Sequence, residues 1–362
     1  MKNNYRPTWA EVNLNNLKHN YGILQAKNPR KTIIPIVKAD AYGHGAIEVV
    51  NSLKKNGVTF FGVSLLEEAL ELRSEFSDID IIALGAIYPN QLEVAYKNDI
   101  IVTIYSYDFG LELLKKDFPV RSHIKIDTGM NRLGIKNFNE VRALIEMFNA
   151  HPIHRLEGMF THFATSDSNE CFFYQQLNKF EELLSLITPI PNIIHLSNSS
   201  SIIKYEKKID FSTHSRLGIS LYGLSLEADV DYLKPVMTIK TRIVQIKTLS
   251  PGEHVGYGTT YTATNKERVG VLPIGYADGL VRKNSSGHVE INGKTYPFIG
   301  RICMDYAFIR IDENVTMDDE VIIMGGNLVT IDDIAIRLNT ITYEIVTQIS
   351  KRIPRVYIGK DD

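Results

Sequence analysis

Eight alternations of a short apolar run with a helical pattern constrain the fold of this chain most strongly. The runs are bounded by turn residues, as buried parallel strands are, and the segments between them carry apolar residues at helical spacing. The runs cover residues 32–38, 59–64, 79–85, 100–105, 122–127, 155–161, 192–197 and 211–217. Eight such units within about 200 residues predict an α/β fold, a (β/α)8 barrel.

A doubly wound parallel sheet is the competing arrangement for the same alternation. Its dinucleotide-binding version carries G-x-G-x-x-G directly after a strand, and no such motif follows any of the runs. This absence favours the barrel.

From about residue 235 the pattern changes to short β-type runs. Residues 236–246 alternate between apolar and polar side chains, and Asn292-Gly293 between runs 288–291 and 294–298 predicts a hairpin. A helix is expected at 331–338, before a closing segment at 343–357. The sequence therefore predicts a barrel domain at 1–232 and a mainly β C-terminal domain at 233–362, with residues 1–10 able to pair with the latter.

Composition excludes several classes of function. The 362 residues carry a net charge of -2, so no basic excess supports nucleic-acid binding. No apolar segment resembles a signal peptide or reaches membrane-spanning length, and the two cysteines, Cys171 and Cys303, form no disulfide framework. No metal-binding motif is present. We expect a cytoplasmic protein without a metal.

Lys38 stands at the end of the first apolar run, where a charged side chain is least expected. Loss of hydration makes such an ammonium easier to deprotonate, and a neutral amine beside a cavity can form a Schiff base with a carbonyl cofactor such as pyridoxal phosphate. Tyr42, Gly43 and Gly45 follow at once and offer a hydroxyl and close backbone approach to an anion. The alternative is a strand-end lysine that reaches into water.

Further polar groups follow other predicted strands, where barrel active sites lie. The fork of Arg132 fits a carboxylate, although an arginine can equally tie down a loop. His162 is compatible with an ordinary core histidine, and Tyr257 with a hairpin aromatic that packs on a sheet. The turn after Arg216 can present backbone N–H groups to phosphate.

The amino-acid sequences of these loops closely resemble those of one protein family. Val37-Lys38-Ala39-Asp40-Ala41-Tyr42-Gly43-His44-Gly45 is similar to the cofactor-lysine signature of the alanine racemases, and the resemblance continues through 127–134, 273–279 and 300–305. It implies an isomerase, an amino-acid racemase that interconverts L- and D-alanine with pyridoxal phosphate and supplies D-alanine for cell-wall peptidoglycan. It also implies a homodimer with shared active sites.

The resemblance assigns roles to individual residues. Lys38 would hold the cofactor and serve one face of the substrate, while Tyr257 of the second subunit serves the other through a chain to His162 and Arg216. The implied cofactor-binding residues are Lys38, Tyr42, Arg132, His162, Ser199, Arg216, Gly218, Ile219 and Lys351. Arg132 and Met304 would bind the substrate. Tyr276, Arg301 and Asp167 would line the access passage, and Lys125 is a candidate for carbamylation.

Lys351 departs from the family pattern, because well-known members have a tyrosine there that hydrogen-bonds the cofactor phosphate. Two other functions remain open. One is a protein that binds the cofactor without turnover, although barrel relatives of that kind lack the β domain. The other is amino-acid decarboxylation, which requires an acid or cysteine proton donor such as Cys303.

Overall fold

The structure is a computed structural model that describes residues 5–228 and 230–360. Two compact units account for the described residues. The barrel unit comprises residues 17–41 and 46–234 apart from 229, and the β unit comprises 5–16, 42–45 and 235–360. Residues 1–4 of the N-terminal segment expected to join the β domain lie outside the described residues.

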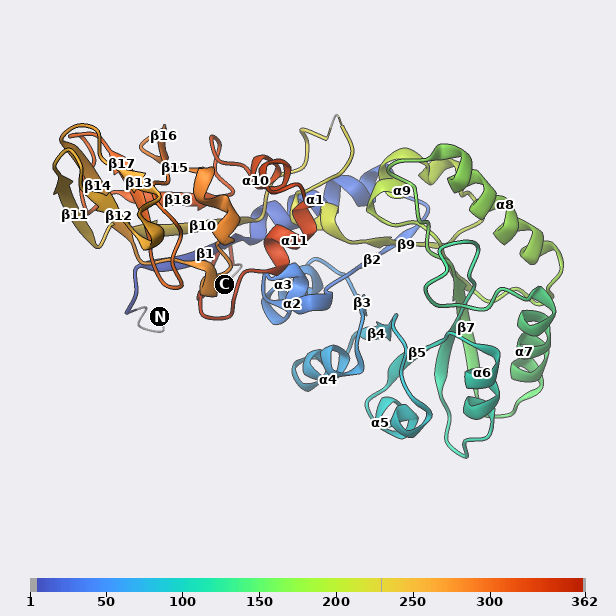
Figure 1. Cartoon of the computed structure of the whole chain (residues 1–362). Helices are drawn as coiled ribbons and strands as arrows, with labels where there is room; N and C mark the ends of the chain where they lie inside the picture. Colours follow the sequence, from blue (N-terminus) through green and yellow to red (C-terminus); the bar gives the residue numbers. More distant parts are fainter. Residues whose placement is uncertain (1–4, 229, 361–362) are drawn as a thin grey trace. The chain divides into compact units, whose positions relative to one another are not determined.

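Eight parallel strands form the barrel unit, in the order β2-β9-β8-β7-β6-β5-β4-β3 (Figure 1). Between β2 and β3 the pairing is limited to the bridge between Ile36 and Gly62, so the barrel is nearly closed. The predicted (β/α)8 barrel is confirmed. The strands are β2 (Thr32–Pro35), β3 (Phe60–Val63), β4 (Asp80–Ala83), β5 (Ile100–Ile104), β6 (Arg121–Lys125), β7 (Arg155–Phe160), β8 (Ile193–His195) and β9 (His214–Leu217).

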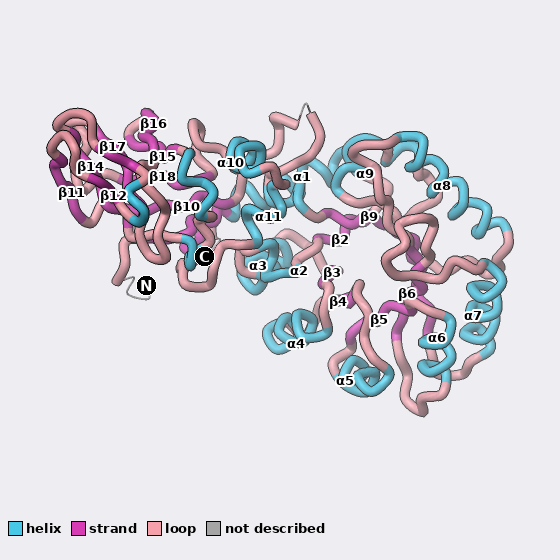
Figure 2. The backbone as a smooth tube through the Cα atoms, viewed as in Figure 1, coloured by secondary structure: helices cyan, strands magenta, loops and turns pink. Residues whose placement is uncertain are grey.

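Helices follow the strands and lie outside them, as the cyan and magenta segments of Figure 2 show. Every residue of β3 and of β5 is buried, because these strands are covered on both sides. The helices of this part are α1 (Leu14–Lys27), α2 (Lys38–Tyr42), α3 (Ala46–Lys55), α4 (Leu66–Glu75), α5 (Leu92–Lys97), α6 (Tyr107–Leu114), α7 (Phe138–Ala150), α8 (Glu170–Ser185) and α9 (Ser199–Lys204).

The β unit contains a six-stranded sheet of order β16-β15-β18-β10-β1-β19 and a three-stranded sheet of order β11-β14-β17. The mainly β C-terminal domain is therefore confirmed. The six-stranded sheet consists of β1 (Thr8–Asn13), β10 (Met237–Arg242), β15 (His288–Ile291), β16 (Lys294–Pro297), β18 (Glu320–Met324) and β19 (Arg355–Ile358). The smaller one consists of β11 (Gln245–Leu249), β14 (Glu267–Leu272) and β17 (Ala307–Ile311).

Two local elements that the sequence predicts for this unit are confirmed. The hairpin at Asn292-Gly293 is confirmed: both residues have positive φ, as the tight turn requires, and β15 pairs with β16. The helix predicted at 331–338 is α10 (Ile331–Leu338), and α11 (Thr342–Thr347) follows it. The alternating segment 236–246 forms β-structure, as its pattern indicates, and it divides between β10 and β11 in two different sheets.

A buried ion pair fastens the N-terminal segment within the β unit. Arg6 donates from both terminal nitrogens to the two oxygens of Asp278, each at 2.9 Å, and the Asp278 side chain is fully buried. The same carboxylate accepts the backbone N–H of Gly275 at 3.0 Å. Asp278 therefore joins the segment before β1 to the turn that carries Tyr276.

Replacing Asp278 should destabilise this unit strongly. In Asp278→Asn the Arg6 fork loses its anionic partner, and breaking one side of a buried pair costs about 3 kcal/mol. We expect a lower melting temperature and a lower denaturant midpoint. Glu93→Gln is the matched control, because its ion pair with Lys97 lies on an exposed helix face. An Asp278→Asn protein as stable as that control would contradict this account.

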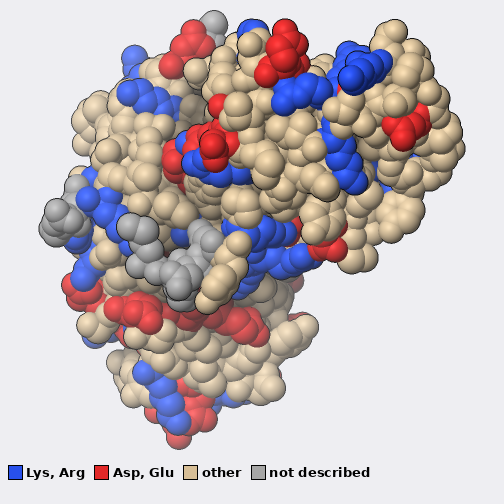
Figure 3. All heavy atoms as spheres, turned by 90° about the vertical axis from the view of Figure 1, so that its left-hand side faces the viewer, with Lys and Arg blue, Asp and Glu red and all other residues tan. Residues whose placement is uncertain are grey.

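The surface shows no segregation of charge on the face drawn in Figure 3, where basic and acidic side chains are interspersed. Within residues 5–228 and 230–360, no helix combines the length and apolar character needed to span a membrane.

Candidate active site

Lys38 begins a short turn with an unusual backbone. β2 ends at Pro35, three residues before the predicted end of that strand, and the chain continues through Val37, whose N–H donates to Gly62 O of β3 at 2.9 Å. Ala39, Asp40, Ala41 and Tyr42 then have φ between 51° and 53°, which is the left-handed region. Each such residue costs about 1–2 kcal/mol, so the surroundings must impose this conformation.

The surroundings of Lys38 favour its neutral amine. Burial is the main cause that lowers the pKa of Lys38, the cation of Arg132 lowers it further, and the carboxylate of Glu68 opposes both. Its side chain lies at the carboxyl end of the first barrel strand, where barrel enzymes place their reacting groups.

Arg132 stands in a loop whose backbone is fixed at both ends. The carboxylate of Asp127 accepts the N–H groups of Gly129 and Asn131, both at 3.0 Å. The loop then returns to β6, where Ile135 N–H donates to Lys125 O at 2.9 Å. The exposed guanidinium of Arg132 is therefore presented from a rigid base at the end of the strand.

Lys125, the last residue of β6, lies among cations. Burial, Arg132 and Arg216 lower its pKa to about 8, while Asp127 acts in the opposite direction. The side chain is 5% exposed, and its Nζ lies 5.5 Å from the ring centroid of Phe160. About half of this amine is neutral at pH 8, whereas an ordinary lysine is almost fully protonated there.

Arg216, on β9, joins residues of three neighbouring strands. One terminal nitrogen lies 2.7 Å from His195 Nδ1, and the other lies 3.2 Å from His162 Nδ1 and donates to Thr161 O at 2.7 Å. The structure thus brings together the predicted pair His162 and Arg216. Burial lowers the pKa of Arg216 to about 9, with a contribution from Arg132, and this still leaves the guanidinium protonated at pH 7.

This geometry defines which ring nitrogen of His162 carries the proton, since a guanidinium can only donate hydrogen bonds. Nδ1 of His162 must accept from Arg216, so the proton of the neutral ring is on Nε2. Burial and the adjacent cations hold the pKa of His162 well below its ordinary value, so the ring is neutral at pH 7. His162 therefore offers one N–H donor on the side away from Arg216.

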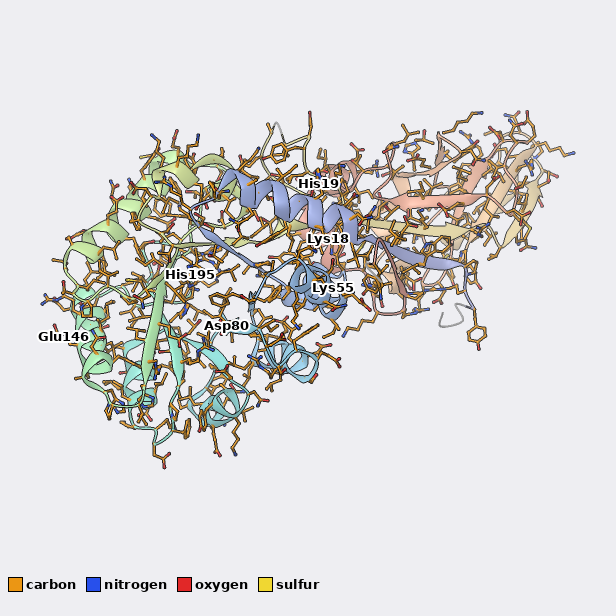
Figure 4. The ribbon with its side chains drawn as sticks, turned by 180° about the vertical axis from the view of Figure 1, so that it is seen from behind. Lys18, His19, Lys55, Asp80, Glu146 and His195 are labelled. Atoms are coloured by element: carbon orange, nitrogen blue, oxygen red, sulfur yellow. The ribbon has the colours of Figure 1, made fainter. Side chains whose placement is uncertain are left out.

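Two histidines that the sequence analysis did not single out, His195 and His123, extend this series of hydrogen bonds into the barrel. His195 accepts from Arg216 through Nδ1, so its Nε2–H donates to His123 Nδ1, 2.9 Å away. Both rings are fully buried, and burial lowers the pKa of each, that of His123 to about 3. Figure 4 shows His195 within the ring of strands, whereas Glu146 lies on an outer helix.

An anion-binding geometry lies where β8 and β9 end. Ser199 Oγ accepts the backbone N–H groups of Gly218, at 3.0 Å, and of Ser220, at 3.3 Å. The hydroxyls of Ser197 and Ser220 are buried, and neither has a hydrogen-bond partner among the described residues. Loops after the seventh and eighth strands are the recurrent phosphate site of such barrels. The hydroxyls of Ser197 and Ser220 are therefore available to donate hydrogen bonds to a phosphate group.

The remaining predicted residues of this unit and the adjoining turn differ in exposure. Ile219, which follows Gly218, is 1% exposed, while Asp167 is exposed in the loop after β7. Tyr42 ends the left-handed turn, belongs to the β unit and is 6% exposed, with its ring centroid 6.1 Å from that of Tyr343.

The β unit presents a second group of predicted residues. Tyr257, in η4 (Tyr257–Thr259), is 72% exposed, and the Arg301 side chain passes beside the next residue, Gly258. Tyr276 N–H donates to Cys303 O at 3.0 Å, which brings the exposed side chains of Tyr276 and Met304 onto neighbouring turns. Lys351 lies in an exposed turn before β19.

Each unit, taken by itself, offers groups that can take part in proton transfer. The barrel unit offers an amine of lowered pKa, guanidinium donors and an anion cradle, and the β unit offers an accessible phenol. In the described part of the chain, no three His, Cys, Asp or Glu side chains are placed to hold a metal ion. A parallel barrel with such groups at the carboxyl ends of its strands belongs to the class of (β/α)8-barrel enzymes.

Comparison with known proteins narrows this class. Residues 12–226 match the family model of the alanine racemase N-terminal domain, and residues 236–357 match that of the alanine racemase C-terminal domain. The alanine racemase of Listeria innocua serovar 6a is 42% identical over 366 residues, which cover 98% of this chain and 99% of that protein.

Solved structures of alanine racemases also match this chain over nearly its whole length. An alanine racemase of Clostridium difficile 630 matches with a TM-score of 0.91 at 38% identity, covering 97% of this chain and 96% of that one. An alanine racemase of Bacillus anthracis with bound L-Ala-P matches with a TM-score of 0.90 at 32% identity, covering 98% and 95%. The chain belongs to the alanine racemase family. It is an amino-acid racemase.

Proposed function

We propose that this chain interconverts L- and D-alanine with pyridoxal phosphate held by Lys38. The observation that carries the proposal is the cationic cluster at the strand ends, in which Lys125 and Arg216 are buried, and burial and Arg132 lower the pKa of Lys38. The residues present fit the cofactor. The amine of Lys38 would react with its aldehyde. The buried hydroxyl groups of Ser197 and Ser220, which have no hydrogen-bond partner among the described residues, would be available to its phosphate. When bound, the cofactor delocalises negative charge that develops at the substrate Cα.

Each cofactor-binding residue has a distinct task. Ser199, Gly218 and Ile219, with the hydroxyl of Tyr42, would bind the phosphate. Arg216 would face the ring nitrogen; since it remains protonated, it donates a hydrogen bond and leaves that nitrogen without a proton. Lys351 would add a point charge to the phosphate site, where a tyrosine stands in other family members.

Inversion requires removal of a proton from one face of Cα and return of a proton to the other. Two fixed bases need less motion than one base that must cross between the faces. Lys38 Nζ would serve one face and the Tyr257 hydroxyl of the second subunit in a homodimer the other. His162, with its proton on Nε2, can donate to that phenolic oxygen and stabilise its charged form.

We expect a small substrate, because Tyr257, Tyr276 and Met304 would crowd the space beside its side chain. Arg132 would bind the substrate carboxylate, assisted by the backbone N–H of Met304. Tyr276, Arg301 and Asp167 would line the passage to solvent. L-Ala-P in the Bacillus anthracis relative fits the same assignment to alanine. The proposed role is synthesis of D-alanine for peptidoglycan in the cytoplasm.

A direct assay tests this function. Purified protein incubated with D-alanine in deuterium oxide should become yellow with added cofactor and should yield L-alanine that carries deuterium at Cα. A cofactor carrier without turnover would be yellow but would leave D-alanine unchanged. A decarboxylase would instead release ethylamine and carbon dioxide. Either of these outcomes would overturn the proposal.

Lys125 provides a further prediction. Carbon dioxide adds only to a neutral amine, and the pKa of about 8 makes that form available at pH 8 and scarce at pH 6. Carbon-13 NMR with labelled bicarbonate should therefore detect a carbamate at pH 8 that is lost on acidification. The signal should disappear in Lys125→Ala and persist in Lys136→Ala, a change at an exposed lysine. A signal that survives Lys125→Ala would contradict the assignment.

A further inference from the structure

The two carboxylate oxygens of Glu68 accept hydrogen bonds from different parts of the barrel unit. The residue lies in the first turn of α4, and its Oε2 accepts the N–H groups of Ser64, at 2.8 Å, and Leu65, at 3.0 Å. This contact caps the helix, as a glutamate at the third helical position commonly does. The cap uses only one of the two oxygens.

The other oxygen makes a hydrogen bond outside the helix. Glu68 Oε1 accepts the backbone N–H of Ala39 at 2.6 Å, and Ala39 directly follows Lys38. The register of the barrel makes this contact geometrically natural, since Ile36 bridges to Gly62 and the residues after β2 and β3 emerge side by side. A short hydrogen bond to an ionised acceptor is stronger than one to a neutral acceptor.

This contact acts on a backbone that needs support. Ala39 is the first of five consecutive residues with positive φ, and only the last of them, Gly43, is a glycine. Glu68 supports the start of the turn, while Asp40 Oδ1 accepts Ala46 N–H at 2.8 Å further along. The position of the Lys38 side chain depends on how this turn is held.

We propose that Glu68 is a positioning residue for Lys38: it fixes the backbone directly after the lysine and places a negative charge beside a predominantly cationic cluster. The charged and titratable groups that influence Lys38 come from several elements: Arg132 follows β6, Lys125 ends β6, His162 follows β7, and Glu68 lies on α4. Among the groups that shift the pKa of Lys38, Glu68 opposes Arg132.

A carboxylate is specifically suited to this position. Three N–H donors approach the two oxygens, and glutamine offers only one oxygen, so its NH2 group would face a donor. Glu68→Gln therefore loses both the charge and one set of hydrogen bonds. Glu68→Asp keeps the charge but is one methylene shorter, so it cannot serve α4 and Ala39 together.

The experiment measures the titration of Lys38 separately from turnover. The lysines of the full-length chain are dimethylated with labelled formaldehyde and cyanoborohydride as the reductant, and the carbon-13 signal of Lys38, assigned by its absence in Lys38→Ala, is followed against pH. In Glu68→Gln we expect the midpoint to fall by about one pH unit, because an opposite charge has been removed. In Glu68→Asp the negative charge remains, so the midpoint should fall by less than in Glu68→Gln. Glu67→Gln, a change at the exposed neighbouring acid of the same helix turn, is the control.

Turnover supplies the second readout. We expect kcat to fall about 10- to 100-fold in Glu68→Gln, with a smaller change in KM, because a displaced Lys38 impairs proton transfer. A Glu68→Gln protein whose titration midpoint and kcat both equal those of Glu67→Gln would overturn the inference. So would a Glu68→Asp midpoint shifted as far as that of Glu68→Gln. The inference rests on the proposed function of Lys38, but the titration needs no cofactor; an active Lys38→Ala protein would defeat the function alone.

Discussion

Lys38→Ala is expected to abolish both the yellow colour of the cofactor-loaded protein and the racemisation of alanine. The variant would lose the atom that we propose to hold the cofactor and to donate a proton to one face of the substrate, so the rate should fall by at least about 10⁴-fold. Absorbance spectroscopy and a coupled assay for L-alanine measure the two effects. Circular dichroism should show an unchanged fold, because the side chain is only partly buried.

Chemical rescue makes this result specific. A small amine such as methylamine should restore part of the racemisation in Lys38→Ala, since it can replace the missing Nζ in proton transfer. Lys97→Ala, a change at an exposed lysine of α5, should behave as wild type. Full turnover in Lys38→Ala without added amine would refute the assignment of this residue.

Tyr257→Phe should uncouple exchange from inversion. Without the phenolic oxygen one face of Cα would lose its proposed base, so racemisation should fall by about 10²- to 10³-fold. Lys38 remains, so one enantiomer should continue to exchange its Cα hydrogen with solvent, while exchange in the other enantiomer slows together with inversion. Proton NMR in deuterium oxide measures both rates for each enantiomer.

The control for this variant is Tyr88→Phe, because Tyr88 is similarly exposed, at 68%, and lies outside the proposed site. It should leave all four rates unchanged. Equal and mild effects of Tyr257→Phe on the two enantiomers would contradict a separate base on each face.

Features that depend on local chemistry could be predicted from the sequence. The turn at Asn292-Gly293 follows from the ability of these two residues to adopt positive φ, and α10 begins at a threonine cap with a strong apolar period behind it. The eight strands were recognisable because each is a short buried run between turn signals. Their boundaries were less certain, as β2 shows.

Features imposed by tertiary contacts could not be predicted. Asp40 tolerates a left-handed conformation, but Ala39 and Ala41 do not favour one. The conformation therefore depends on partners such as Glu68, which lies 29 residues along the chain from Ala39. His195 belongs to a three-residue strand, too short to reveal which side faces the barrel interior. The segment 236–246 keeps its alternation while the backbone passes from one sheet to another.

Complementation between two inactive variants tests the central claim most directly. Lys38→Ala and Tyr257→Phe proteins are mixed in equal amounts, dissociated and allowed to reassociate. If each site takes its lysine from one subunit and its tyrosine from the other, half of the dimers contain one intact site, and about one quarter of the wild-type activity should return. If both residues of a site belong to the same subunit, no mixed dimer contains an intact site, and the absence of any recovery would contradict the account.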